Sequence, residues 1–168
     1  MNLLVRNENP GDVDAIARLT EAAFADAPHT SHTEHFIVAA LRKAGQLSVS
    51  LVALDGDDLV GHVAVSPVTL STGQSGWYGL GPISVRPDRQ GRGIGSALMA
   101  GAIERLKAMG GAGCVLLGEP GYYARFGFRA CDRLVLPGVP AAYFQALPLA
   151  EGVPAAEVSY HAAFEASA

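Results

Sequence analysis

The chain has 168 residues, of which 49% are hydrophobic and 17% charged, and its formal net charge is −4. This length suits one domain with a hydrophobic core and is too short for two ordinary domains, so we expect residues 1–168 to form a single domain. The composition excludes a disordered chain, and the net negative charge argues against nucleic acid as the main partner.

The cysteines and the lengths of the apolar runs indicate where in the cell the protein is expected to act. Cys114 and Cys131 have no metal-ligand or redox spacing and are typical of buried thiols in a reducing environment. Arg6 and Glu8 interrupt the first apolar run, and no run approaches the roughly 18 apolar residues of a membrane span. We therefore expect a cytoplasmic protein that does not act at a membrane.

The first third of the chain predicts one strand and two helices. Leu3 to Arg6 is a candidate strand, and Asp12 can cap a helix whose apolar residues recur at helical spacing. Residues 28–30 break this helix. Ser31 to Glu34 has the form of a capping box that opens a second helix, for which Gly45 is a natural end.

The middle of the chain changes to a period of two, which is typical of strands. A hairpin signal, Asp55-Gly56, joins the runs Ser48 to Leu54 and Leu59 to Leu70, and a third run extends from Trp77 to Val85. The short links predict an antiparallel meander. Gly79, Gly81 and Pro82 in the third run predict a bulge, or a place where a ligand or another backbone comes close.

A helix and a short strand follow a polar loop at Arg86 to Arg92. The predicted buried face of this helix comprises Ile94, Leu98, Ala102, Leu106 and Met109. The strand Cys114 to Leu117 should be parallel to the strand before the loop, because the crossover is long enough to hold a helix.

Beyond Gly121, short elements are expected. We predict a helical turn near Tyr123 and late strands at Tyr143 to Leu147 and Ala156 to Tyr160. The whole order, βαα-βββ-α-β-α-β(β), predicts an α/β fold of the α+β kind. Its central sheet would be mixed, mostly antiparallel and flanked by helices.

The segment from Arg86 to Ser96 has the clearest chemical pattern. It follows a strand and opens a helix, whose first amides lack partners and favour an anion. Gly91, Gly93 and Gly95 lack the Cβ atoms that would keep a diphosphate away from those amides, and Arg89 and Arg92 add mobile positive charge. A flexible turn before a helix is the simpler alternative.

Two other glycine motifs do not fit this segment. A Walker A loop needs Gly-Lys-Ser/Thr, and no Lys is present. A dinucleotide fingerprint needs a third glycine where Ser96 stands, and it follows the first strand of a βαβ unit rather than a meander. A nucleotide-binding protein is therefore disfavoured.

Two motifs give the chain a family resemblance. Gln90-Gly91-Arg92-Gly93-Ile94-Gly95 matches the pattern Q/R-x-x-G-x-G/A after a strand, and Tyr122 to Phe128 contains a Tyr-x-x-x-Gly-Phe element. With these motifs the chain resembles the GNAT superfamily of acetyltransferases, and residues 117–123 resemble its bacterial YhbS-like group. The resemblance implies an N-acetyltransferase that moves an acetyl group from acetyl-CoA directly to a primary amine, without a metal.

The resemblance also implies roles for individual residues. Main-chain groups of the strand before the loop would pair with the pantetheine arm, and one amide would bind the thioester oxygen. Amides of the glycine turn would take the pyrophosphate. Tyr123 matches the tyrosine that protonates the departing thiolate, with neighbouring Tyr122 or a packing role as alternatives. The coenzyme-binding residues expected are Ile83, Ser84, Val85, Gln90, Gly91, Arg92, Gly93, Ile94, Gly95 and Ser96.

A base for the attacking amine is not evident. Some GNAT enzymes place a Glu on the strand before the phosphate loop, but Trp77 to Val85 contains no acidic residue. Glu34, His35, His62 and Glu119 are possible substitutes. Glu119, at the end of a buried strand, is our candidate for a base or an amine contact. The missing carboxylate leaves a second hypothesis open, a catalytically idle acyl-CoA sensor.

The histidines between the first two predicted helices resemble a metal cluster only at first sight. His29, His32 and His35 have i, i+3, i+6 spacing, but this spacing crosses a predicted helix cap and no second ligand group is evident. We interpret them as a solvated loop. The GNAT resemblance implies that the acceptor pocket lies at this position, between the first two helices, where the loop would shape specificity. The sequence does not say which small-molecule or peptide amine is the acceptor, nor whether the chain forms a homodimer.

Overall fold

The main sheet of the protein is mixed and mostly antiparallel, as predicted. The computed structural model describes residues 1–27 and 30–168. The seven strands lie in the order β1-β2-β3-β5-β6-β9-β7, and neighbours are antiparallel except β5 and β6, which are parallel. Their bounds are β1 Leu3–Asn7, β2 Val49–Asp55, β3 Asp58–Pro67, β5 Trp77–Val85, β6 Gly113–Leu117, β7 Arg129–Ala130 and β9 Phe144–Pro148.

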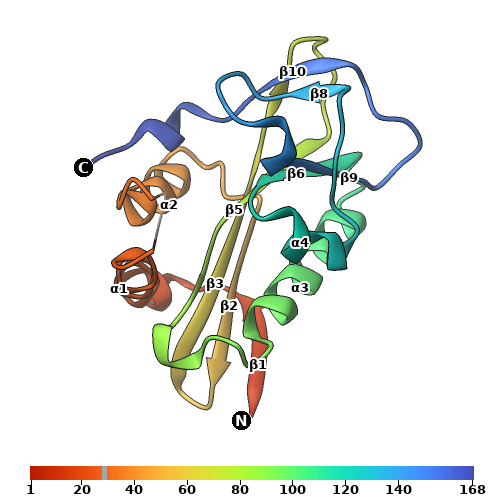
Figure 1. The fold of residues 1–168 in the computed structure, drawn as a ribbon. Coiled ribbons are helices and arrows are strands. Elements are labelled where there is room, and N and C mark those ends of the chain that lie inside the picture. Colours follow the sequence, from red (N-terminus) through yellow and green to blue (C-terminus); the bar gives the residue numbers. More distant parts are fainter. Residues whose placement is uncertain (28–29) are drawn as a thin grey trace.

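Helices cover both faces of this sheet. Figure 1 shows α1 and α2 on one face and α3 and α4 on the other. Their bounds are α1 Val13–Phe24, α2 Glu34–Lys43, α3 Ile94–Ala108 and α4 Pro120–Tyr123. Short 3-10 turns are η1 Pro10–Asp12, η2 Pro87–Arg89, η3 Ala124–Phe126, η4 Ala141–Tyr143 and η5 Ala162–Glu165. Within the described residues, no helix has the length and apolar character needed to cross a bilayer.

A second, three-stranded sheet was not predicted. It consists of β4 Thr69–Leu70, β10 Ala156–Ser159 and β8 Leu134–Val135, in that order. The sequence predicts one strand over Leu59 to Leu70, but β3 ends at Pro67 and β4 joins the second sheet. Pro67 has no amide hydrogen with which to continue the ladder.

The side chains of β2 alternate between two cores. Leu51 and Ala53 of β2 pack in the core beneath α3, whereas Val52 packs with Ile16 and Val38 beneath α1 and α2. This alternation is the period of two that predicted the strands. Both faces of the sheet are therefore buried at β2.

The buried face of α3 is predicted correctly except at its end. Ile94, Leu98, Ala102 and Leu106 are buried, but Met109 is 47% exposed. The prediction for Met109 is wrong because α3 ends at Ala108 and Met109 is its C-cap residue.

The N-terminal capping predictions for α1 and α2 are only partly right. Asp12 precedes α1, but its carboxylate accepts from the Asn9 amide at 2.8 Å and from Arg6 at 2.7 Å. The capping box at Ser31 to Glu34 is absent from the described residues, since Thr33 is the N-cap of α2 and has no side-chain cap bond.

The C-terminal end of α2 agrees with its prediction. Gly45 has a φ of +71°, which glycine adopts without strain. The Gln46 amide bonds the Leu41 carbonyl and the Gly45 amide bonds that of Arg42. This pair of bonds is a Schellman motif, which ends the helix.

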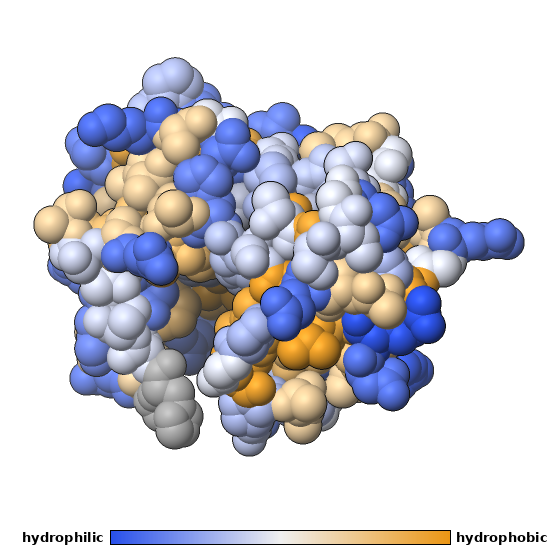
Figure 2. Space-filling model, turned by 90° about the horizontal axis from the view of Figure 1, so that it is seen from above, coloured by the Kyte–Doolittle hydropathy of each residue, from blue (hydrophilic) through white to orange (hydrophobic). Residues whose placement is uncertain are grey.

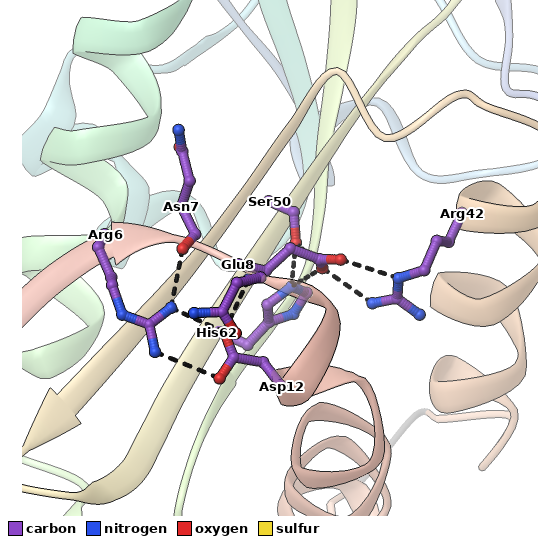
Figure 3. Close-up of polar contacts among 8 residues, drawn as sticks. Arg6, Asn7, Glu8, Asp12, Arg42, Ser50 and His62 are labelled. Carbon is purple, nitrogen blue, oxygen red and sulfur yellow. Dashed lines mark hydrogen bonds and ion pairs between the residues drawn. The ribbon is translucent and has the colours of Figure 1, made fainter.

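A polar network lies between α2 and the sheet (Figure 3). Glu8 accepts two hydrogen bonds from Arg42 of α2, both at 2.9 Å, and a third from the Ser50 hydroxyl. The Ser50 oxygen lies 2.8 Å from Nε2 of the fully buried His62. Because Ser50 donates to Glu8, it accepts from His62, whose proton is therefore on Nε2. Burial lowers the pKa of His62 to about 4, so this side chain is neutral at pH 7.

Candidate active site

Strand β5 is irregular where its glycines predict a bulge. Gly81 has a φ of +139°, a conformation that other residues rarely adopt. The ladder with β3 changes register between Val63, paired with Ile83, and Val65, paired with Leu80. The predicted irregularity is confirmed.

Beyond this point, β5 and β6 diverge. The two strands pair only at Trp77, Tyr78 and Gly79, whereas β6 continues to pair with β9 as far as Leu117. In the described chain, Leu80 to Val85 therefore have no strand partner on the side of β6. The sheet is open there, with peptide groups of β5 that face no neighbouring strand, and the Val85 carbonyl accepts a hydrogen bond from the Gln90 side chain at 3.3 Å.

The glycine turn lies beside this opening. Gly91 and Gly93 have φ values of +78° and +83°, and no atom lies within 4 Å of a Cβ built on either residue. Ala97 is bonded to the Gly93 carbonyl at 3.1 Å. The amides of Ile94, Gly95 and Ser96 precede this first bond of α3, so they point out of the helix end without an i−4 partner.

One predicted feature of the turn is wrong. Arg89 is not a mobile charge, because its Nη1 lies 2.5 Å from Oδ2 of Asp55 and its side chain is only 18% exposed. It holds the loop against the β2–β3 hairpin. Arg92 is exposed, as predicted for a mobile charge.

A hollow of ≈ 470 Å³ lies between the turn, β5 and α4. Of the predicted coenzyme-binding residues, it is lined by Ile83, Val85, Gln90, Gly91, Gly93, Ile94, Gly95 and Ser96. Ser84 and Arg92 are not among its lining residues. Ser84 pairs with His62 and is 2% exposed, so its side chain lies on the opposite face of the sheet.

One side chain that was not predicted to belong to this site also lines this hollow. Arg125 donates to the Ser96 hydroxyl at 3.1 Å, and its guanidinium lies 4.5 Å from the centroid of the Tyr122 ring. The hollow thus has one cation at the helix end where the amides are free. Arg125 stands inside the Tyr122 to Phe128 motif, which is the signal that could have identified it.

Tyr123 also lines this hollow. Its ring packs edge-on against Tyr122, with centroids 4.8 Å apart, and its side chain is partly buried against the main core. Burial, and to a lesser degree the neighbouring Tyr122, raise the pKa of the Tyr123 phenol above its ordinary value of 10.0. The phenol is therefore protonated at neutral pH and available as a proton donor.

A second hollow, of ≈ 520 Å³, adjoins the first and shares Ile83 and Tyr123 with it. On the face seen from above, hydrophobic residues gather around a depression (Figure 2). The apolar lining of this second hollow is Phe24, Ile37, Leu80, Pro82, Ile83, Leu116, Leu117, Leu136, Pro137, Val139 and Phe164, with Gly81, Glu34, Tyr123 and Tyr160.

The four candidate bases lie in different places. Glu34 lines the second hollow. Glu119 is exposed at the N-cap of α4 and lines neither hollow. His35 is 3.1 Å from Glu21, and His62 is buried in the network beneath α2.

The histidine loop has no metal-site geometry in the described residues. His29 lies outside them, and His32 is exposed. No group of three His, Cys, Asp or Glu residues in the described chain is placed to hold a metal ion.

Comparison with known proteins decides the family. Residues 5–131 match a family model described as an acetyltransferase (GNAT) domain. The chain belongs to the GNAT acetyltransferase family. It is 34% identical over 146 residues to the uncharacterized N-acetyltransferase YhbS of Escherichia coli strain K12, covering 84% of each chain. The predicted resemblance to the YhbS-like group is confirmed.

Solved structures of GNAT acetyltransferases share this fold. One from Brucella melitensis, in complex with acetyl-CoA, is 44% identical with a TM-score of 0.87, covering 97% of this chain and 98% of that one. YhbS from Escherichia coli, in complex with CoA, is 34% identical with a TM-score of 0.86, covering 98% and 93%. This chain is thus an acyltransferase of the GNAT family, and the alternative of an idle sensor is not favoured.

Proposed function

We propose that this GNAT acetyltransferase moves the acetyl group of acetyl-CoA directly to a primary amine. The observation that supports this most is the meeting of two hollows at Ile83 and Tyr123, one beside a turn suited to phosphate and one with an apolar lining and a carboxylate. Two reactants bound in such adjoining spaces would be held in contact, which removes much of the entropic cost of their reaction.

The coenzyme would occupy the first hollow and the opening between β5 and β6. Peptide groups of Ile83 to Val85 on the open side of β5 would bond the pantetheine amides, and the amides of Gly91 to Ser96 would bind the pyrophosphate. The Arg125 guanidinium, beside Ser96, would add a charge-assisted contact to a phosphate oxygen. The complexes of the Brucella and Escherichia proteins with acetyl-CoA and CoA support this placement.

The transfer would need one base and one acid. The neutral amine nitrogen attacks the thioester carbonyl carbon, the new C–N bond forms, and the C–S bond breaks with its electron pair on sulfur. Tyr123 would give its phenolic proton to this thiolate, while the nitrogen would lose its extra proton to a base. Glu34 suits the role of base better than Glu119, because Glu34 lines the hollow next to Tyr123.

The acidity of Tyr123 limits how it can act. An unperturbed phenol has a pKa near 10 and a thiol near 8.5, so the proton moves to sulfur only if the thiolate is close and poorly hydrated. Burial raises the pKa of Tyr123 further and keeps the phenol protonated across the neutral range. Tyr123 would therefore donate its proton directly to the leaving thiolate and would not release it to solvent.

The test is a thiol-release assay with acetyl-CoA and a panel of amines. Tyr123→Phe should lower kcat by roughly 10²-fold, the usual contribution of a general acid, with an unchanged calorimetric affinity for coenzyme A. Tyr143→Phe, at a tyrosine that is 42% exposed, is the matched control. Tight coenzyme binding without thiol release for any amine would favour the sensor instead. We also propose that residues 1–168 form a single domain, that the protein is cytoplasmic and that the reaction needs no metal.

A further inference from the structure

The second hollow has one carboxylate in a lining that is otherwise apolar apart from Tyr123 and Tyr160. Its walls come from separate segments, including Phe24 of α1, Ile37 of α2, Leu116 of β6 and Val139 before η4. Among the described residues that line it, Glu34 is the one acidic side chain, and none is Lys, Arg or His. A ligand with several positive charges would leave most of them without partners there, at a large desolvation cost. A single amino group on an apolar body matches this lining.

Glu34 has one oxygen available for that amino group. Its Oε2 accepts a hydrogen bond from the Thr30 hydroxyl at 2.5 Å, while its Oε1 is buried and has no hydrogen-bond partner among the described residues. A carboxylate oxygen buried without a donor is unfavourable. A small turn of the side chain toward the hollow would present Oε1 to a bound amine without breaking any bond at that oxygen.

The position of Glu34 relative to the coenzyme hollow determines which way the amino group of a bound acceptor would face. Glu34 and Tyr123 line the same second hollow, and Tyr123 and Ile83 also line the first. An amine held by Glu34 would thus face the place where the thioester is expected. The volume of the second hollow, ≈ 520 Å³, lies within the range of small-molecule sites, which is roughly 300–1,000 Å³.

We propose that the acceptor is a small primary amine on a compact apolar or aromatic body, with Glu34 as the residue that binds and deprotonates its amino group. This inference rests on the proposed acetyl transfer. The apolar body fills the space between α1, α2, β6 and η5, and the amino group lies toward Tyr123. Polyamines, aminoglycosides and basic peptides are poor acceptors on this proposal.

Two acceptor series test the proposal with the full chain and acetyl-CoA. In the series from ethylamine to hexylamine, each added CH₂ should raise kcat/KM roughly fourfold until the hollow is full, because burial of one methylene contributes about that factor. Phenethylamine should exceed spermidine and an N-terminal lysyl peptide by at least roughly tenfold, since these carry extra charge into the apolar lining. A peptide with an N-terminal phenylalanine has a similar aromatic amine at a peptide terminus. Comparing it with phenethylamine shows whether the acceptor is a free small amine or a peptide.

Two variants connect these preferences to the hollow. Val139→Asp should abolish the rise with chain length and leave the affinity for coenzyme A unchanged. Glu34→Gln should lower kcat/KM for phenethylamine by roughly 10²-fold and leave the affinity for coenzyme A unchanged. Glu21→Gln, at an exposed position on α1, is the control and should change neither.

The failures of the two proposals are distinguishable. If no amine releases thiol while coenzyme A binds tightly, the proposed acetyl transfer is wrong. If spermidine or basic peptides are acetylated well and alkylamines are not, the transfer stands and the apolar acceptor is wrong. If alkylamines are acetylated but Val139→Asp and Glu34→Gln behave as the wild type, the acceptor binds elsewhere and the inference is overturned.

Discussion

The ring of Tyr123 lies against the Cα of Gly118 so closely that a Cβ atom on Gly118 would overlap its Cε2 and Cδ2. The backbone of Gly118 cannot easily yield, because its amide bonds the Tyr143 carbonyl at 3.0 Å and its carbonyl accepts from Gln145 at 2.9 Å. Gly118→Ala should therefore displace the Tyr123 ring. We expect kcat to fall by roughly 10²-fold, the effect of a misplacement of about 1 Å.

A nearby glycine gives the matched control for this prediction. A Cβ on Gly121 would meet no atom within 4 Å, so Gly121→Ala should leave kcat unchanged. Steady-state kinetics with acetyl-CoA measures both variants, and calorimetry with coenzyme A checks that the coenzyme still binds. Full activity in Gly118→Ala would show that the position of Tyr123 does not limit the reaction.

Gly95→Val should weaken coenzyme binding. A Cβ on Gly95 would already lie 3.1 Å from the Tyr122 hydroxyl, and the larger side chain of valine would fill the hollow at the free amides. Overpacking of this size costs roughly 1–3 kcal/mol, which corresponds to about 5- to 150-fold in Kd. Calorimetric titration with coenzyme A measures the change.

Ala100→Val controls for the lower helix propensity of valine, because Ala100 lies on the exposed side of the same helix. Its affinity for coenzyme A should equal that of the wild type. If Gly95→Val also left the affinity for coenzyme A unchanged, the glycine turn would not be part of the proposed phosphate site.

The ion pair between Arg89 and Asp55 predicts an indirect role for Arg89. If Arg89 positions the glycine turn, Arg89→Gln and Asp55→Asn should each weaken coenzyme binding by about two- to fivefold, within the usual range for such pairs. The double variant should be no weaker than either single one. If Arg89 instead contacts phosphate directly, Asp55→Asn will not weaken binding and only Arg89→Gln will, with a smaller dependence on salt.

The buried His62 predicts a loss of stability in mild acid. Its pKa is 6.5 in the unfolded chain and about 4 in the folded protein, where burial disfavours the charged ring. Between these pH values the unfolded state binds more protons, so the free energy of unfolding falls as the pH falls. The fall from pH 7.5 to pH 5.5 should be about 1.4 kcal/mol from this residue alone.

Urea unfolding at the two pH values measures this effect. Burial alone would raise the pKa of Glu8, but its hydrogen bonds from Arg42 and Ser50 lower it below 4.5, so Glu8 contributes below this range. His62→Gln should remove the difference between pH 7.5 and pH 5.5, and His32→Asn, at an exposed histidine, should retain it. A full pH dependence in His62→Gln would assign the effect to another group.

The regular elements of the fold could be predicted because local patterns determine them. Trp77 to Val85 forms a strand over the predicted range, since its β-branched and aromatic residues lie between turn signals. The parallel pairing of β5 and β6 followed from the length of the helix between them. The glycine turn was recognisable because free helix amides and missing Cβ atoms are local properties.

The site across the sheet could not be predicted in the same way. Glu34 was one of four possible bases, and nothing near it in the sequence shows that the start of α2 lines the same hollow as Tyr123. The pairing of Arg89 with Asp55 joins residues 34 positions apart, which periodicity does not reveal. The short strands β7 and β8 have two residues each, too few for an alternating pattern.

The divergence of β5 and β6 has a consequence for the stability of the protein in the cell. The peptide groups that it leaves unpaired resemble the edge of a sheet, and an extended molecule with amide groups would complete the ladder. On the proposed binding mode the coenzyme is such a molecule, so the protein would resist heat and proteolysis in proportion to the coenzyme supply. At a hundredfold excess over Kd this would add about 2.7 kcal/mol to the free energy of unfolding, and starvation for acetyl groups alone, with free coenzyme A still present, would leave most of it intact.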